Sequence, residues 1–388
     1  ARRDFLKLMG ASLAMATTGC IRRPVQHIIP YAQAPKEITP GEASYYASSW
    51  FDGHQGYGLV VKTLEGRPIK IEGNPAHPMN RGGLPARAHA EVLSLYDPDR
   101  IRGPRRNLLN KARTNFEEIG AKWEDIDTAV SAAAAKGGFA VMTPTIPSPS
   151  TQALMADVLG LFKGKQYVVD TLSMNSVREG QRLSYGKDVL PRYRFDLAKI
   201  IVTIDCDFLG TYLSPAEFAR DFSSRRKPGS DMNRMVAFES LMSLTGMNSD
   251  DRIRIKPSQQ LDVVLGLIHS VNQKSSNHNV TPAIKDYVAQ YSDVSKKIGV
   301  SDKVWTKLVA ELVENRGHSL IIAGGLTTET TDAVSLQVAV NLLNSILDND
   351  GSTIDHEGGY LTNQGVAADL AGLVADMNAG KVKTLVIN

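Results

Sequence analysis

The feature that most constrains this 388-residue chain is a strand–turn–strand pattern between residues 56 and 104. Apolar residues alternate with others up to Glu65-Gly66, a turn-forming dipeptide, and a second alternating run follows at residues 68–72. This pattern is typical of a β-hairpin. A loop rich in Gly, Asn, Pro and His comes next and leads into a short helical stretch. The sequence therefore predicts a small β-rich domain near the N-terminus.

After this domain, short apolar runs alternate with longer amphipathic stretches. The apolar runs predict buried strands, and the stretches with helical spacing predict helices that cover them. The expected strands lie at residues 139–142, 166–169, 199–204, 235–238, 252–255, 319–323 and 383–388. The main expected helices lie at residues 152–162, 259–271, 332–347 and 369–378. Because strands and helices alternate, we expect an α/β fold with doubly wound parallel-sheet domains.

The hairpin and its loop also match a longer motif. Residues 66–84 read GR-x-x-K-x-EG-NP-x-HP-x-N-x-G-x-L, and the helical stretch closes on YDPDRI at residues 96–101. This long and specific pattern resembles the N-terminal domain of the molybdopterin oxidoreductases. The resemblance implies a molybdopterin-oxidoreductase-like fold, with a small N-terminal β-rich domain followed by doubly wound domains.

In cofactor-bearing members of that family, the N-terminal domain holds an iron–sulphur cluster through a C-x2-C-x3-C-x27-C arrangement. Thiolates are needed because soft sulphur ligands bind iron in such clusters. In this chain the four cysteine places fall on Trp50, Gly53, Tyr57 and Pro85, none of which can ligate iron. The chain has two cysteines, too few for a four-cysteine site. We therefore expect no cofactor and no metal within this segment.

Two other cofactor contacts of the family give weaker signals. Near the place where catalytic members present a molybdenum ligand, this chain has Ser173, so a serine ligand is one alternative. A serine after a strand is more often a turn or cap residue. After the expected strand 199–204, Asp205 and Asp207 would repel a pyrophosphate unless they are salt-bridged or act as caps. Cys206, between them, has the pattern of a buried core thiol. No catalytic residue is predicted.

The N-terminus resembles that of an exported lipoprotein. Arg2-Arg3 begins an R-R-x-F-L-K motif, typical of a twin-arginine signal, and a short apolar run follows. The run ends at Cys20 in a sequence similar to a bacterial lipobox, with Thr17 where an aliphatic residue is usual. We expect acylation of Cys20 and a location at the periplasmic face of the bacterial inner membrane. The alternative is an exported protein with an incidental cysteine.

These features divide the chain into five predicted segments. They are a twin-arginine-type signal (1–19), a lipid-anchored linker (20–44), a degenerate, cluster-free iron–sulphur-type domain (45–130), Rossmann-like α/β domains (131–315) and a continuing α/β domain (316–388). Because the last expected strand ends at Asn388, we expect that domain to be truncated. By resemblance, iron–sulphur clusters are expected in the part of the polypeptide after Asn388.

The charge of the chain argues against one class of function. The net charge is +3, and a basic cluster occurs only between Arg100 and Arg113, so the sequence lacks the broad basic face of a nucleic-acid-binding protein. No spacing of His and Cys suggests a zinc site, and no phosphate-binding glycine motif is present.

The missing cluster cysteines, the twin-arginine motif and the lipobox together resemble the large iron–sulphur subunit of alternative complex III, a membrane quinol oxidoreductase. The resemblance implies a non-catalytic, cofactor-free scaffold that supports electron transfer by clusters and haems elsewhere. Its implied partners are integral-membrane quinol-binding subunits, a c-type haem subunit and a periplasmic cytochrome c or equivalent acceptor. Two alternatives stay open: the catalytic molybdopterin subunit of a periplasmic molybdoenzyme of the polysulphide or thiosulphate reductase type, and an exported lipoprotein that acts alone as a binding module.

Overall fold

The computed structural model of the chain describes residues 38–53, 55–109, 116–120, 122–229, 231–275 and 280–388. The chain divides into two compact units. One unit comprises residues 1–44 and 64–67, of which 38–44 and 64–67 are described, and the other comprises residues 45–63 and 68–388. None of the helices in the described ranges is both long and apolar enough to cross a membrane.

The predicted hairpin is confirmed. It consists of β2 (Gly56–Leu64) and β3 (Arg67–Gly73), and β1 (Ala43–Phe51) extends it to a sheet of order β1-β2-β3. Glu65 and Gly66 have φ values of 50° and 78°, as required in a two-residue turn whose twist matches the flanking strands. The elements that follow are α2 (Ala86–Ala90), η1 (Glu91–Tyr96), the antiparallel pair β4 (Arg105–Leu109) and β5 (Phe116–Gly120), and α3 (Trp123–Ala134).

The largest sheet has four parallel strands in the order β11-β10-β9-β12, which confirms the predicted parallel sheet. Its strands are β9 (Ile200–Ile204), β10 (Arg234–Glu239), β11 (Asp251–Arg254) and β12 (Ser319–Ala323). All five residues of β9 are buried. Side chains alternate between the two faces of a strand, so Val202 joins one core cluster and Ile201 joins the other.

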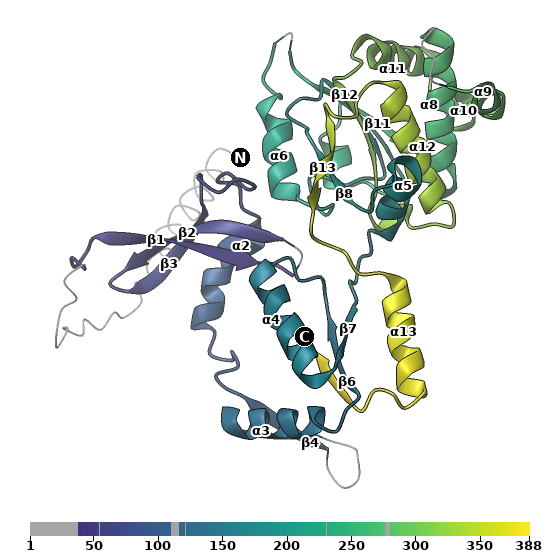
Figure 1. Cartoon of the computed structure of the whole chain (residues 1–388). Helices are drawn as coiled ribbons and strands as arrows, with labels where there is room; N and C mark the ends of the chain where they lie inside the picture. The colour runs from purple at the N-terminus through teal and green to yellow at the C-terminus, as the bar shows by residue number, and fades with distance from the viewer. Residues whose placement is uncertain (1–37, 54, 110–115, 121, 230, 276–279) are drawn as a thin grey trace, which may run out of the picture. The chain divides into compact units, whose positions relative to one another are not determined.

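Helices cover both faces of this sheet (Figure 1). The core around Val202 is formed with α8 (Gln260–Lys274), α9 (Pro282–Ala289), α10 (Val294–Lys297), α11 (Asp302–Glu314) and α12 (Ala333–Ile346). The core around Ile201 is formed with α5 (Asn175–Tyr185), α6 (Pro215–Ser224) and the antiparallel strands β8 (Leu190–Tyr193) and β13 (Ile354–Tyr360). Three short helices, α7 (Leu244–Met247), η2 (Pro257–Gln259) and η3 (Leu326–Thr328), follow the carboxyl ends of strands.

A second parallel sheet has the order β14-β6-β7. Its strands are β6 (Phe139–Thr143), β7 (Lys165–Val168) and β14 (Thr384–Ile387). Helix α4 (Pro149–Phe162) packs with Phe139 and Val141, and α13 (Ala367–Asn378) packs with Ala140 on the other face. Because β12 joins the first sheet and β14 joins the second, residues after 315 contribute to both. The predicted domain limits stay predictions.

Helix α4 begins three residues before the expected helix at 152–162. The Ser148 hydroxyl accepts a hydrogen bond from the Thr151 N–H at 3.4 Å, and Pro149 occupies the first turn, where its missing N–H has no cost.

Asn344 on α12 satisfies backbone groups of the edge strand β12. Its side chain is fully buried, accepts a hydrogen bond from the Ile321 N–H at 3.1 Å and donates one to the Ile321 carbonyl at 2.8 Å. It also accepts a hydrogen bond from Asn349 Nδ2 at 2.9 Å. Because β12 has a neighbouring strand on one side only, Asn344 supplies the bonds that a further strand would make.

We predict that Asn344→Leu lowers the free energy of unfolding by about 2–5 kcal/mol, because it leaves two buried backbone groups without partners. Urea denaturation followed by circular dichroism measures the change. The control is Asn378→Leu at the exposed end of α13, where we expect a change within about 0.5 kcal/mol. Equal losses in the two variants would contradict the role given to Asn344.

Candidate functional site

The structure brings together two of the four residues at the cluster-cysteine places. Trp50 on β1 and Tyr57 on β2 have ring centroids 5.8 Å apart, with planes inclined by 32°. Gly53 lies in the turn between these strands, with a φ of 95° that favours glycine. Pro85 is the N-cap residue of α2. Gly53 and Pro85 therefore shape the backbone, whereas Trp50 and Tyr57 pack against each other.

Asp52 and Arg87 complete what we call the aromatic–ion cluster (Trp50, Asp52, Tyr57 and Arg87). The Arg87 guanidinium lies 5.6 Å from the centroid of the Trp50 ring and forms an ion pair with Asp52. Tyr57 is 3% exposed, and burial together with the Asp52 charge raises the pKa of its hydroxyl well above the usual value. None of these residues offers a thiolate or an imidazole, so they do not fit an iron–sulphur cluster.

The Asn/Pro/His loop motif has a structural role in the same domain. Asn80 is fully buried; it accepts a hydrogen bond from the Gly58 N–H at 3.0 Å and donates to the carbonyls of Gly58 and Gly83 at 3.0 and 2.8 Å. His77 packs so closely on Gly58 that a Cβ at Gly58 would lie 2.5 Å from the imidazole Cγ. The motif therefore joins the loop to strand β2.

Ser173 forms a turn just before α5, whose N-cap residue is Met174. Its hydroxyl accepts a hydrogen bond from the N–H of Asn175, the first residue of α5, at 3.1 Å and donates one to the Gly365 carbonyl at 3.4 Å. Nearby, Asp170 accepts hydrogen bonds from the Thr145 N–H at 2.8 Å and the Gly365 N–H at 2.7 Å. These bonds fix the loops after β6 and β7 and explain why polar residues follow those strands.

Asp205 and Asp207 lie just after β9, at the carboxyl edge of the four-stranded sheet. Asp205 accepts hydrogen bonds from the Ser240 N–H at 2.7 Å and from Gln260 Nε2 at 2.6 Å. Asp207 accepts hydrogen bonds from the Thr245 N–H at 3.0 Å and the Thr245 hydroxyl at 2.9 Å. The sequence left two roles open for these aspartates, salt bridge or cap. Both carboxylates cap neighbouring backbone N–H groups, and neither forms a salt bridge with a described residue.

A third carboxylate, Glu239, lies at the same edge. It is 3% exposed, accepts a hydrogen bond from the Ser243 hydroxyl at 2.6 Å and forms an ion pair with Arg252. A Cβ at Gly246 would lie 1.8 Å from a Glu239 oxygen, so a larger residue there would displace this carboxylate. A pyrophosphate would add negative charge beside Asp205 and Asp207, which form no ion pair with a described residue, in a region of low dielectric. The edge therefore does not fit a dinucleotide cofactor.

Cys206 is the predicted buried thiol. It is 3% exposed, and burial, together with the charges of Asp207 and Asp205, raises its pKa well above the usual value. Close packing also restricts the backbone after β12, because a Cβ at Gly324 would lie 2.3 Å from the Tyr212 ring. No group of three or more His, Cys, Asp or Glu within the described ranges could hold a metal ion.

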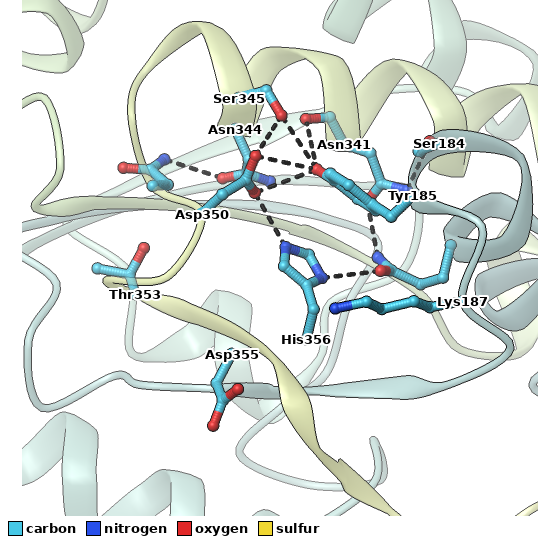
Figure 2. A network of polar contacts seen from close by, with 12 residues as sticks. Ser184, Tyr185, Lys187, Asn341, Asn344, Ser345, Asp350, Thr353, Asp355 and His356 are labelled. Atoms are coloured by element: carbon cyan, nitrogen blue, oxygen red, sulfur yellow. Dashed lines mark hydrogen bonds and ion pairs between the residues drawn. The ribbon is translucent and has the colours of Figure 1, made fainter.

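The structure also contains a polar network that the sequence did not predict, between α5, α12 and β13 (Figure 2). His356 on β13 is hydrogen-bonded through Nε2 to Asp350 at 3.0 Å and through Nδ1 to the Gln181 side-chain oxygen at 2.9 Å. Its ring centroid is 4.2 Å from that of Tyr185. Both imidazole nitrogens thus face side-chain oxygen atoms.

Tyr185 and Asp350 form the centre of this network. The Tyr185 hydroxyl donates to Asp350 at 3.1 Å and lies 3.1 Å from the Ser345 hydroxyl. Burial, with the charge of Asp350, raises the pKa of Tyr185 well above its usual value. Burial alone would raise the pKa of Asp350, but hydrogen bonds from His356 and Ser345 outweigh it and hold that pKa below the usual value. Because these polar groups form hydrogen bonds with one another, the network links α5, α12 and β13.

The N-terminal predictions cannot be placed in the same way. Arg2, Arg3 and Cys20 lie outside the described residues. The export signal and the lipid anchor at Cys20 therefore stay predictions.

No protein-family model matches this chain, but individual known proteins resemble it. The solved structure of acetylene hydratase from Pelobacter acetylenicus has a TM-score of 0.56 at 13% identity, over 80% of this chain and 42% of that one. The fold is molybdopterin-oxidoreductase-like. At this identity, the likeness concerns the fold alone.

The second relative is the molybdopterin-binding-like subunit of a menaquinone reductase from Nitratidesulfovibrio vulgaris. It is 23% identical over 365 residues, a match that covers 90% of this chain and 52% of that protein. The chain thus spans about half the length of this curated relative. The expected molybdopterin-oxidoreductase-like fold is confirmed, whereas neither relative distinguishes alternative complex III from other complexes that contain this fold.

We predict that Tyr57→Cys, which returns a thiol to one cluster place, lowers the free energy of unfolding by about 3–5 kcal/mol, because the ring is lost from a buried site. Tyr57→Phe keeps the ring and is expected to cost about 1 kcal/mol or less. Guanidinium denaturation measures both. A Tyr57→Cys protein as stable as the Tyr57→Phe control would show that the aromatic–ion cluster does not stabilise the domain.

We also predict a dependence of stability on pH that comes from Asp350. Because its folded-state pKa is lowered, its contribution is complete above about pH 4 and is lost as the pH falls through the folded-state pKa. Asp350→Asn should lower the free energy of unfolding at pH 7 by about 1–3 kcal/mol and flatten its decrease below about pH 4. Denaturation curves between pH 2 and pH 7 measure this, with the exposed Asp286→Asn as the control. An unchanged pH profile in Asp350→Asn would contradict the prediction.

Proposed function

We propose that this chain is a cofactor-free, non-catalytic scaffold within a membrane-bound, quinone-linked electron-transfer complex of the alternative complex III type. The observation that carries the proposal is the aromatic–ion cluster. Trp50 and Tyr57 pack against each other at two of the places where cofactor-bearing relatives are expected to present cysteine, and Arg87 covers the Trp50 ring. Two of the four ligand positions thus pack in the small core of the domain, which favours a structural role.

The carboxyl edge of the four-stranded sheet supports the same proposal. Open α/β sheets bind nucleotides beyond the carboxyl ends of their strands. Here Asp205, Asp207 and Glu239 occupy that edge and take up hydrogen-bond donors of the following loops. We infer that a pterin dinucleotide is not bound there and that electrons pass through iron–sulphur clusters and haems outside residues 1–388.

The membrane partners follow from the relative and from the N-terminal sequence. The relative is named as a subunit of a menaquinone reductase, and this chain carries the lipobox-like Cys20. We propose anchoring through acylated Cys20 at the periplasmic face of the inner membrane, beside integral-membrane quinol-binding subunits and a c-type haem subunit. A periplasmic cytochrome c or an equivalent carrier would be the electron acceptor.

We predict that the chain, purified from its native membranes in mild detergent, co-purifies with haem-bearing and integral-membrane subunits. Elemental analysis should give far less than one molybdenum or tungsten per chain, and acid oxidation should release no pterin guanine dinucleotide. One molybdenum and one pterin per chain would establish the catalytic alternative. A stable monomer with no membrane partner would establish the isolated lipoprotein.

We further predict that Ser173→Ala leaves the quinol-linked electron-transfer rate of the purified complex within about twofold, because Ser173 forms a turn before α5. A serine ligand of molybdenum would instead be essential for turnover. Ser148→Ala, which removes the N-cap hydrogen bond of α4, is the control for a small loss of helix stability. A loss of more than about 100-fold in Ser173→Ala alone, a barrier of about 2.7 kcal/mol, would overturn the scaffold proposal.

A further inference from the structure

The amino-terminal edge of the second parallel sheet carries a group of exposed lysines, which we call the lysine edge. Strands β14, β6 and β7 are in parallel register, so they begin at the same edge of the sheet. The lysines lie at the start of a strand or in the loop before it, and they are Lys136, Lys163, Lys165, Lys381 and Lys383. They come from three separate segments of the sequence, so the fold brings them together.

One carboxylate lies among these lysines. Lys165 Nζ is 3.1 Å from one oxygen of Asp376, and Lys381 Nζ is 3.0 Å from the other. Hydrogen bonds from Tyr167, Lys381 and Lys165 lower the pKa of Asp376, so this carboxylate is charged at neutral pH. Two lysines thus share one negative charge, which holds them side by side and leaves a positive charge over.

The other three lysines lie beside this pair. The Lys383 N–H donates a hydrogen bond to the Gly138 carbonyl at 2.8 Å, and Lys136 precedes Gly138 in the same loop. Lys163 is the C-cap residue of α4, directly before β7 begins at Lys165. None of these three lysines forms an ion pair with a residue in the described ranges.

The helix C-termini account for part of the positive charge. Helices α3, α4 and α13 end a few residues before β6, β7 and β14 begin, and each helix C-terminus carries about half a negative charge. Together with Asp376, the three ends offset roughly half of the charge of the five lysines. The other acidic residues of these helices lie more than one helical turn before the C-termini. The lysine edge therefore has more positive charge than the local structure neutralises.

Exposed apolar side chains flank the lysine edge on both faces of the sheet. Leu161, in the last turn of α4, is 76% exposed, and Met377, in the last turn of α13, is 48% exposed. Leu370 and Val374 are also exposed and continue from Met377 as a stripe along α13. Because α4 and α13 cover opposite faces of the sheet, these apolar side chains lie on either side of the lysines.

We infer that the lysine edge lies against an anionic lipid surface, with its ammonium groups at the headgroup phosphates and Leu161 and Met377 at the boundary with the acyl chains. Basic side chains beside exposed apolar ones are the combination that binds proteins to the surface of anionic membranes. The inference rests on the proposed function in one respect, because the proposed membrane location brings the lysine edge within reach of lipid.

The kind of cation favours lipid over an acidic protein. All five cations of the lysine edge are lysines, and protein interfaces are depleted in lysine and enriched in arginine. Arginine forms planar, paired hydrogen bonds to a fixed carboxylate, whereas lysine acts as a point charge on a flexible stem. A fluid layer of headgroups offers charge without a fixed geometry, so lysine suits it.

Photo-crosslinking tests the occupant in the purified complex, reconstituted into vesicles of equal parts phosphatidylcholine and phosphatidylglycerol. A benzophenone amino acid replaces Leu161 or, as the control, Tyr287 on α9, which is 52% exposed. We expect about tenfold more lipid adduct at Leu161, and mass spectrometry should find mainly the anionic lipid in it. A mainly protein adduct at Leu161, equal lipid yields at the two positions, or equal labelling of the two lipids would overturn the inference.

Charge reversal tests the role of the lysines. Lys163→Glu with Lys383→Glu should reduce the lipid adduct at Leu161 about fivefold, and raised salt should reduce the adduct of the unchanged chain, because exposed charges are screened. Lys285→Glu with Lys303→Glu, on α9 and α11, is the matched control, since both lysines are exposed and neither pairs with a described residue. An unchanged yield in the first pair, or an equal loss in both pairs, would overturn the inference.

The failure of this inference is distinguishable from the failure of the proposed function. Haem content and co-purification of the membrane subunits show whether each variant complex is assembled. If the complex is assembled and free of molybdenum but Leu161 gives no lipid adduct, the inference alone fails. A chain without membrane partners, or one with stoichiometric molybdenum, would instead overturn the proposed function.

Discussion

The arrangement of this chain depends on one strand that is buried on both faces. Strand β9 is hydrogen-bonded to β10 on one side and to β12 on the other, and its five residues are all buried. Apolar side chains on both faces of β9 require a helical layer on each side, because an uncovered face would expose them to water. Asp205 and Asp207 follow this strand directly and therefore lie in the middle of the carboxyl edge. The packing of β9 in the core thus sets the position of both carboxylates.

The N-terminal domain has a similar constraint on a smaller scale. Its apolar core consists of Tyr57, Leu59 and Ile71, with Trp50 packed against it. A core of this size loses much of its buried apolar surface if one ring is removed, because small domains bury a smaller share of their surface. If a metal cluster held this domain in cofactor-bearing relatives, aromatic packing and the Arg87–Asp52 ion pair are the interactions that hold it here.

The parts of the fold that could be predicted from the sequence are those with strong local signals. The turn at Glu65-Gly66 and the apolar strands β9 and β12 have such signals, and the turn at Ser173 and the burial of Cys206 follow from residue type. Strand β13 could not be predicted, because it contains Asp355, His356, Glu357 and two glycines and forms through pairing with β8. The residues of the His356 network come from segments up to 175 positions apart, so no spacing in the sequence predicts the network.

At the carboxyl edge of the four-stranded sheet, side chains of the chain itself take up backbone N–H groups of the following loops. In dinucleotide-binding sheets, phosphate takes the N–H groups at helix starts beyond the strand ends. Here those donors at the start of α7 are used by side chains: Asp207 accepts from Thr245 N–H at 3.0 Å, Glu239 from Ser243 N–H at 3.3 Å, and Ser243 Oγ from Gly246 N–H at 3.0 Å. A carboxylate attached to the same chain competes as an intramolecular ligand, with a high effective concentration. An incoming phosphate would have to displace it and also approach its charge. The internal carboxylates therefore satisfy the loop backbone and place negative charge where a phosphate would approach.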